Sequence, residues 1–243
     1  RQIVMRKIYP CIFYYLHKSI HHVLSIYESM NVNPSIQEYL LDNISDIQHV
    51  ILEVSKFLDN HLYLDNCKSV SSMTTFDENI IKPGVSDDLD TLLNNVKENN
   101  ELFDYIHTLL NEIVRSEDKS SKPIEYVKIH QTEKSGVSLQ ITKKRGLLLK
   151  SYIQKHGDES IDKLNTKWKD VKLNTASTTC DEIDFPLLTK ICRDLLHQKD
   201  YMNKLVSKSY QDILSTLENN HYEHLEQIAE YVSRVDTLHN KAY

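Results

Sequence analysis

Glycine and proline are scarce in this sequence, with four Gly and five Pro among 243 residues. Folds rich in β-strands need these residues in their turns, so their scarcity argues against an all-β architecture. Apolar residues make up 40% of the chain, a content that suits long helices sharing thin cores better than one thick core. We therefore expect a mostly α-helical fold.

Cysteine pairs and long apolar runs are also missing. The four cysteines, at positions 11, 67, 180 and 192, form no Cys-x-x-Cys pair, so neither a zinc site nor a disulfide is indicated. The longest apolar runs, such as residues 12–16, are far shorter than the roughly 20 residues of a membrane-spanning helix. We expect an intracellular protein with no membrane partner. Because the chain begins at Arg1 and stops at Tyr243 without an ending signal, we also expect it to be a piece of a longer protein.

Recognisable catalytic motifs are absent. The glycines are scattered and no phosphate loop can be formed from them, and no nucleophile and base stand in a known pattern. His221 and His224 are three residues apart, but no second ligand pair accompanies them, so surface or packing histidines are the better interpretation. Histidines 17, 21 and 22 could share one helix face, again at a surface or interface. We predict no enzyme activity, metal or cofactor for these residues.

Three series of apolar residues recur at intervals of three and four, which is typical of amphipathic helices. They cover residues 40–58, 89–113 and 187–238. The second follows Ser86 and three aspartates (Asp87, Asp88 and Asp90), which suit a helix N-terminus better than a carboxylate site. The third follows Pro186, a residue tolerated in a first turn. It would span about 80 Å if it were helical throughout, so we expect at least one break.

Between the second and third series the apolar period changes to two. Apolar residues alternate with polar ones over 127–129 and again over 137–141, and Lys-Ser-Gly stands between them at 134–136. This pattern predicts a β-hairpin with one buried face. Residues 151–185 read as mixed helix and loop, with Trp168 as a core anchor. The predicted organisation is a first helical part (1–114), an inserted β-containing module (115–185) and returning helices (186–243).

Positive charge is concentrated in the same module. Residues 119–172 hold thirteen Lys/Arg against six Asp/Glu, whereas the other 189 residues hold sixteen against twenty-nine. A basic island of this kind indicates a site for a polyanion such as DNA or RNA. The alternative is a solvated, lysine-rich loop.

Residues 76–90 (FDENIIKPGVSDDLD) resemble the I-(R/K)-P-G-x-x-x-x-L-D signature of the MutS family of DNA mismatch-repair proteins. In that family the signature opens the long lever helix of the core domain, and a clamp is inserted after the lever. Residues 126–129 and 136–142 are similar to the first two clamp strands, and residues 1–20 are similar to the opening of the core. Two departures are Val137 and Ser138 in place of the usual aromatic pair, and a longer segment over 156–172. They suit an outlying branch, such as the one shared by large DNA viruses and some mitochondria.

The resemblance implies long antiparallel lever helices carrying a small clamp module. An intact member of the family is a dimeric ATPase that recognises mispaired bases in double-stranded DNA. Its mismatch-reading domain would precede these residues, and its ATPase, with ATP and Mg²⁺ as cofactors, would follow them. The levers would couple DNA binding to that distant ATPase.

The resemblance also implies where the clamp would contact DNA phosphates. Six residues would face the duplex: Lys143, Lys144 and Arg145 after the second strand, and Lys172, Asn174 and Thr175 in a returning segment. Two other interpretations remain open. The chain could be a helical scaffold or adaptor whose basic module binds an acidic protein or a membrane surface through an amphipathic basic face. It could also be an enzyme with an unrecognised site, against which the poverty of glycine argues.

Overall fold

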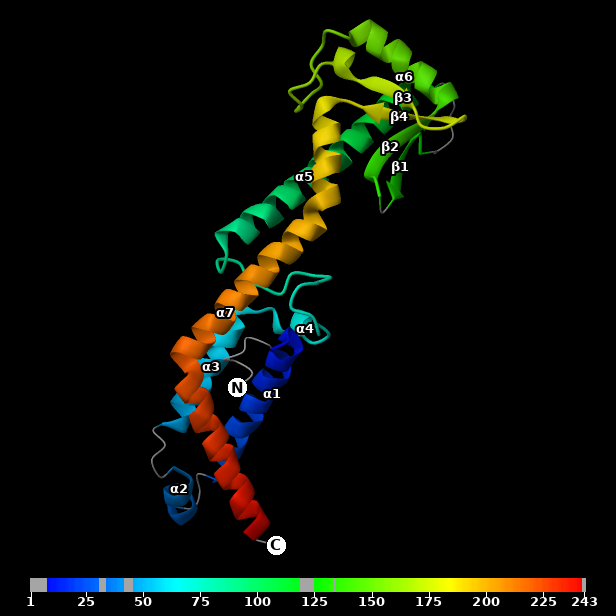
Figure 1. Ribbon diagram of the computed structural model, residues 1–243. Helices are drawn as coiled ribbons and strands as arrows, with labels where there is room; N and C mark the ends of the chain where they lie inside the picture. Colours follow the sequence, from blue (N-terminus) through cyan, green and yellow to red (C-terminus); the bar gives the residue numbers. More distant parts are fainter. Residues whose placement is uncertain (1–7, 31–33, 42–45, 119–124, 133, 242–243) are drawn as a thin grey trace. The chain divides into compact units, whose positions relative to one another are not determined.

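The computed structural model describes residues 8–30, 34–41, 46–118, 125–132 and 134–241. The fold is mostly α-helical with one small antiparallel β-sheet, which confirms the predicted fold class (Figure 1). The chain divides into two compact units. Unit 1 holds residues 1–90 and 202–243, and unit 2 holds residues 91–201. None of the described helices has the length and apolar character needed to cross a membrane.

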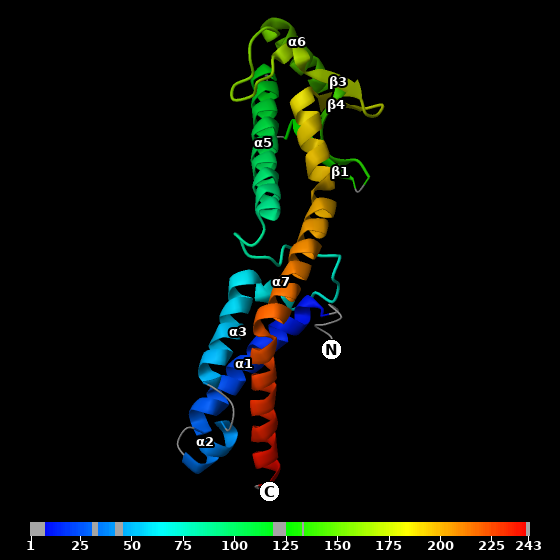
Figure 2. The same ribbon diagram turned by 60° about the vertical axis from the view of Figure 1, so that its left-hand side comes forward.

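Unit 1 is built from helices. They are α1 (Pro10–Met30), α2 (Pro34–Leu41), α3 (Ile47–His61), the short α4 (Leu64–Cys67), the start of α5 (Asp87–Glu117) and most of α7 (Pro186–Lys241). Helices α1, α3 and the later part of α7 lie side by side in both views (Figures 1 and 2). Their shared core includes an edge-to-face contact between Phe13 and Tyr210 with ring centroids 6.1 Å apart. The buried Tyr210 hydroxyl donates a hydrogen bond to the Ile8 carbonyl oxygen at 2.8 Å.

Unit 2 contains the sheet, with strands β1 (Val127–Thr132), β2 (Gly136–Thr142), β3 (Lys172–Thr175) and β4 (Cys180–Asp184) in the order β1-β2-β4-β3. Helix α6 (Lys143–His156) and a 3₁₀ turn (Trp168–Asp170) complete the module. The core joins apolar residues of α5, the sheet, α6 and the first turns of α7, among them Ile106, Leu139, Leu149, Ile183 and Leu188. Trp168 is buried in the same core, as predicted.

Two predicted elements are confirmed. The hairpin is present, because β1 and β2 pair antiparallel from Val127 opposite Ile141 to Thr132 opposite Gly136. Helix α5 begins at Asp87, directly after Ser86, whose hydroxyl accepts a hydrogen bond from the Leu89 amide at 3.4 Å. Ser86 therefore caps the helix, as its position next to acidic residues indicated.

Three expectations about secondary structure are wrong. The helix predicted over 40–58 is two helices, since Asp46 is non-helical and its side chain caps α3 by accepting from the His49 amide; residues 42–45 lie outside the described residues. The break expected in the last helix is missing, and α7 runs unbroken for 56 residues. Sharp kinks need Pro, Gly or an inserted side chain, and no Gly or Pro follows Pro186. Residues 172–175 and 180–184, expected to be helix or loop, are strands.

The predicted module over 115–185 lies inside unit 2, which also includes parts of α5 and α7. Some of the basic island, at residues 119–124 and 133, and the start of the 1–20 segment, at residues 1–7, lie outside the described residues.

Candidate nucleic-acid interface

Helix α6 starts directly after strand β2, with no connecting loop, so that Lys143 is its first residue. One side of the helix is buried on the sheet through residues such as Gly146 and Leu149. At 3.6 residues per turn, Lys144, Leu147 and Lys155 lie on the opposite, exposed side, and Lys143 and Lys150 are exposed at its border. We define the α6 lysine face as the four exposed lysines of this helix: Lys143, Lys144, Lys150 and Lys155.

Most of this lysine face lacks acidic partners. Lys155 Nζ lies 3.6 Å from Glu117 Oε2. Among the described residues, Lys143, Lys144 and Lys150 have no carboxylate within 4.0 Å. These three ammonium groups are therefore available to an external anion.

The position of two of these lysines favours an external anion further. Lys143 and Lys144 stand in the first turn of α6, which holds no acidic residue, and Thr142 makes no capping bond through its side chain. The N-terminus of a helix carries partial positive charge, so each lysine there costs about 0.3–1 kcal/mol of helix stability. The Lys143 amide already donates to the Thr179 carbonyl oxygen at 3.0 Å, so a phosphate bound at this turn would meet chiefly the two ammonium groups and the positive end of the helix dipole.

One buried carboxylate lies on the opposite side of the same turn. Asp181 of β4 is only 7% exposed, and its Oδ2 is 3.5 Å from the point where a side chain at Gly146 would begin. Ile141, the register partner of Asp181, is also next to Gly146, so all three lie between the sheet and the helix. The Asp181 carboxylate therefore offsets part of the helix dipole from the side of the sheet.

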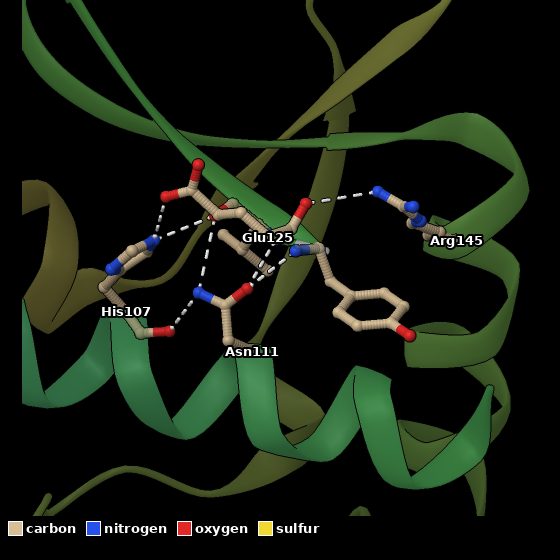
Figure 3. A network of polar contacts seen from close by, with 6 residues as sticks. His107, Asn111, Glu125 and Arg145 are labelled. Atoms are coloured by element: carbon tan, nitrogen blue, oxygen red, sulfur yellow. Dashed lines mark hydrogen bonds and ion pairs between the residues drawn. The ribbon is translucent and has the colours of Figure 1, made fainter. Parts of the chain in front are cut away.

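Arg145, unlike Lys143 and Lys144, makes contacts within the protein. Its guanidinium carbon lies 4.6 Å from the centroid of the Tyr126 ring, within range of a cation–π contact. Its Nη1 donates a hydrogen bond to the Glu125 carbonyl oxygen at 3.2 Å (Figure 3). Arg145 is half-buried and joins the start of α6 to the residues that enter β1, so it has a structural role whether or not it meets DNA.

The entry to β1 is also tied to α5 by a network of polar contacts (Figure 3). Asn111 Oδ1 accepts hydrogen bonds from the amides of Tyr126 at 2.8 Å and Val127 at 2.9 Å, and its Nδ2 donates to the His107 carbonyl oxygen at 2.9 Å. His107 Nε2 lies 2.8 Å from the Val127 carbonyl oxygen and 3.4 Å from Glu125 Oε1. Side chains of α5 thus satisfy backbone groups that an edge strand leaves unpaired, and they fix the hairpin on the helix.

The other three predicted DNA contacts lie on β3, at the opposite edge of the sheet from β1. They are all exposed: Lys172, Asn174 and Thr175. Each stands opposite an acidic residue of β4 in the strand register, namely Asp184, Glu182 and Asp181. Asn174 Nδ2 is also 3.5 Å from Asp184 Oδ2. The electrostatic environment of these residues is therefore mixed rather than positive.

Strand geometry separates the six residues further. Alternate residues of a strand point to opposite faces, and Leu173 packs next to Gly146 of α6, so Lys172 and Asn174 point to the face away from α6. They are not brought into one patch with Lys143 and Lys144.

Lys150 and Lys155 were not among the contacts predicted from the sequence. The seven-residue spacing from Lys143 to Lys150 could have indicated a shared helix face, but only after a helix had been assigned to 143–156. The predicted hairpin and the apolar run at 147–149 hid that helix.

Two comparisons with known proteins found no match. No protein-family model matches this chain, and no curated protein matches it. The family assignment therefore depends on the resemblance of residues 76–90 and of the hairpin strands, and it remains a proposal.

Proposed function

We propose that this chain is the lever and clamp region of a MutS-type mismatch-repair ATPase, and that its sheet module grips duplex DNA by the phosphates without reading base sequence. The observation that carries the DNA-binding part is the α6 lysine face, where three of four lysines have no acidic partner among the described residues. Phosphate contacts position a protein on DNA but carry no direct sequence information, which is the property that a sliding clamp requires.

The segment that resembles the family signature supports the lever assignment. Ile81 is buried and forms a β-bridge with Leu62. Gly84 has φ of +82°, and Leu89 is buried where α5 begins. Three residues of the signature, Ile81, Gly84 and Leu89, thus have a structural role at or just before the start of a long helix.

Coupling between the two units is also part of the proposal. Helices α5 and α7 each contribute residues to both units. A continuous helix can transmit a discrete rearrangement if it has two stable arrangements. In the intact protein, ATP and Mg²⁺ would bind a separate ATPase domain, and two subunits would close their clamps around one duplex.

The test is duplex binding measured by fluorescence anisotropy at several KCl concentrations. The test variant combines Lys143→Gln, Lys144→Gln and Lys150→Gln. Affinity should fall, and the slope of log affinity against log salt should become shallower by about 2–3, because each phosphate contact contributes about 0.9 to the slope. A variant with exposed lysines replaced elsewhere, Lys56→Gln, Lys97→Gln and Lys190→Gln, loses the same charge and should keep the wild-type slope.

Matched and mismatched duplexes should bind equally well, because the mismatch-reading domain of the family is not among these residues. An unchanged slope in the α6 variant would contradict the assignment.

The competing adaptor function has one observation in its favour, since Leu147 is 66% exposed in the middle of the lysine face, as on helices that bind membrane surfaces. Binding to anionic vesicles without salt-dependent duplex binding would select that alternative.

A further inference from the structure

Four polar side chains converge between α1 and α3 of unit 1. His17 and His21 are one turn apart on α1, and their Nε2 atoms are 3.2 Å from each other. Ser55 Oγ lies 3.1 Å from His17 Nε2 and 3.3 Å from His21 Nε2. Asp59 Oδ2 lies 3.2 Å from His17 Nε2. The histidines were expected at a surface or interface; His21 is exposed and His17 half-buried, and both contact Ser55 of α3.

The two imidazole rings direct the same nitrogen at each other. Their centroids are 4.5 Å apart, farther than the two Nε2 atoms, so the Nε2 edges converge on a common space. This geometry differs from a Ser-His-Asp catalytic triad, in which the serine and the aspartate bind opposite nitrogens of one histidine. Here Ser55 and Asp59 both approach Nε2 of His17, so Ser55 is not an activated nucleophile.

A single proton on His17 Nε2 accounts for only part of the contacts of this group. A neutral imidazole nitrogen is either one donor or one acceptor, yet His17 Nε2 faces a carboxylate oxygen, a hydroxyl and a second imidazole nitrogen. One proton cannot serve all three partners. A cation bound between the nitrogens would receive the lone pairs of both rings and the charge of the carboxylate together.

We propose that His17, His21 and Asp59 form a binding site for a divalent transition metal ion of the zinc class. Two nitrogens at about 2.0–2.1 Å from a tetrahedral zinc lie about 3.4 Å from each other, close to the 3.2 Å found here. Two histidines four residues apart on a helix have the spacing of known zinc-binding helices. Imidazole nitrogen favours Zn²⁺, Cu²⁺ and Ni²⁺ over Mg²⁺ or Ca²⁺.

The site is partly formed. Among the described residues no group of three His, Cys, Asp or Glu side chains is already placed to hold a metal ion, and Asp59 reaches His17 Nε2 at 3.2 Å. The Asp59 side chain is 55% exposed and can therefore rotate at little cost. Metal binding would draw it toward the two nitrogens and would link α1 to α3.

The test uses the untagged 243-residue chain, with Co²⁺ as a spectroscopic probe and Zn²⁺ as competitor. The wild type should bind one equivalent of Co²⁺ at this site with the visible absorption of a tetrahedral centre, and Zn²⁺ should displace it and raise the thermal midpoint. His17→Gln and His21→Gln should each weaken Zn²⁺ binding roughly tenfold or more. Asp59→Asn should give a smaller loss.

Two controls separate this site from other histidines. His22→Gln removes an exposed neighbour on α1 and should leave binding unchanged. The double variant His221→Gln, His224→Gln removes the other close pair, whose Nδ1 atoms are 3.3 Å apart, and should also bind as the wild type does. Wild-type affinity in a His21→Gln protein that has a normal circular dichroism spectrum would overturn the proposal, as would loss of binding only in the double variant.

Discussion

The backbone amide of Gly84 donates a hydrogen bond to Asp90 Oδ2, with 2.7 Å between the nitrogen and the oxygen. The bond closes the turn that leads into α5. Gly84 has φ of +82°, a conformation that costs little only for glycine. The six-residue separation between Gly and Asp in the family-like signature therefore has a physical reason, because the aspartate reaches back over the first helical turn to the glycine.

Replacing Asp90 should show how much this hydrogen bond contributes to the free energy of unfolding. Asp90→Ala and Asp87→Ala each remove a negative charge from the helix N-terminus, but only Asp90 has the bond to Gly84. We expect Asp90→Ala to lower the free energy of unfolding by about 1 kcal/mol more than Asp87→Ala. Urea unfolding followed by circular dichroism measures the difference. Equal losses would mean that Asp90 acts only through its charge.

Asn111 should matter more for stability than its polar character suggests. Asn111→Ala removes the acceptor for the buried amides of Tyr126 and Val127. Since each unsatisfied buried group costs about 1–3 kcal/mol, we expect a loss of roughly 2–4 kcal/mol and faster hydrogen exchange at those two amides. Asn111→Asp keeps the acceptor oxygens and loses the amide donor to the carbonyl oxygens of His107 and Val127, so its loss should be smaller. Unchanged exchange at Tyr126 in Asn111→Ala would contradict this account.

Helix α5 and the hairpin could be predicted well because local sequence signals mark where each element begins or ends as well as which of its residues are buried. Ser86 caps the start of α5, and the alternation over 137–141 puts Leu139 and Ile141 in the core. Apolar periodicity alone says which face is buried but not whether a helix is continuous. For that reason the series across Asp46 was joined into one helix, although Asp46 caps a new one.

The candidate interface was harder to predict from the sequence. Strand β4 reads Cys-Asp-Glu-Ile-Asp, and its buried Asp181 breaks the apolar alternation that would have marked it as a strand. Because β4 was not predicted, the separation of Lys172 from Lys143 could not be predicted either. The convergence of His17 with Asp59, which are 42 residues apart, likewise depends on how α1 packs on α3.

Stability should depend on pH through His221. Its ring lies 4.7 Å from the Phe57 ring, and burial, with a smaller contribution from His224, lowers its pKa below the usual 6.5. The unfolded chain therefore takes up this proton first as the pH falls. His221 contributes stability above pH 6.5, and that contribution is lost as the pH falls toward the lower folded pKa.

The wild type should accordingly lose more unfolding free energy between about pH 7 and about pH 5 than His221→Gln does. Urea unfolding at a series of pH values measures both proteins, and His49→Gln, which removes an exposed histidine, serves as the matched control. Parallel pH profiles for the wild type and His221→Gln would show that another group controls the dependence.

Arg145 and Lys144 are adjacent in sequence, but their substitutions should have opposite effects. Arg145→Gln removes the contact with the Tyr126 ring and the bond to the Glu125 carbonyl, so it should lower the free energy of unfolding by about 1–2 kcal/mol and leave the salt slope of duplex binding unchanged. Lys144→Gln removes an exposed ammonium without an acidic partner among the described residues. It should raise the free energy of unfolding by about 0.3–1 kcal/mol, because a positive charge is removed from the helix N-terminus, and it should reduce the slope by about 0.9. Urea unfolding and anisotropy titrations on both variants give the two readouts. A reduced slope in Arg145→Gln at wild-type stability would make Arg145 a phosphate contact and would move the edge of the DNA-binding surface toward β1.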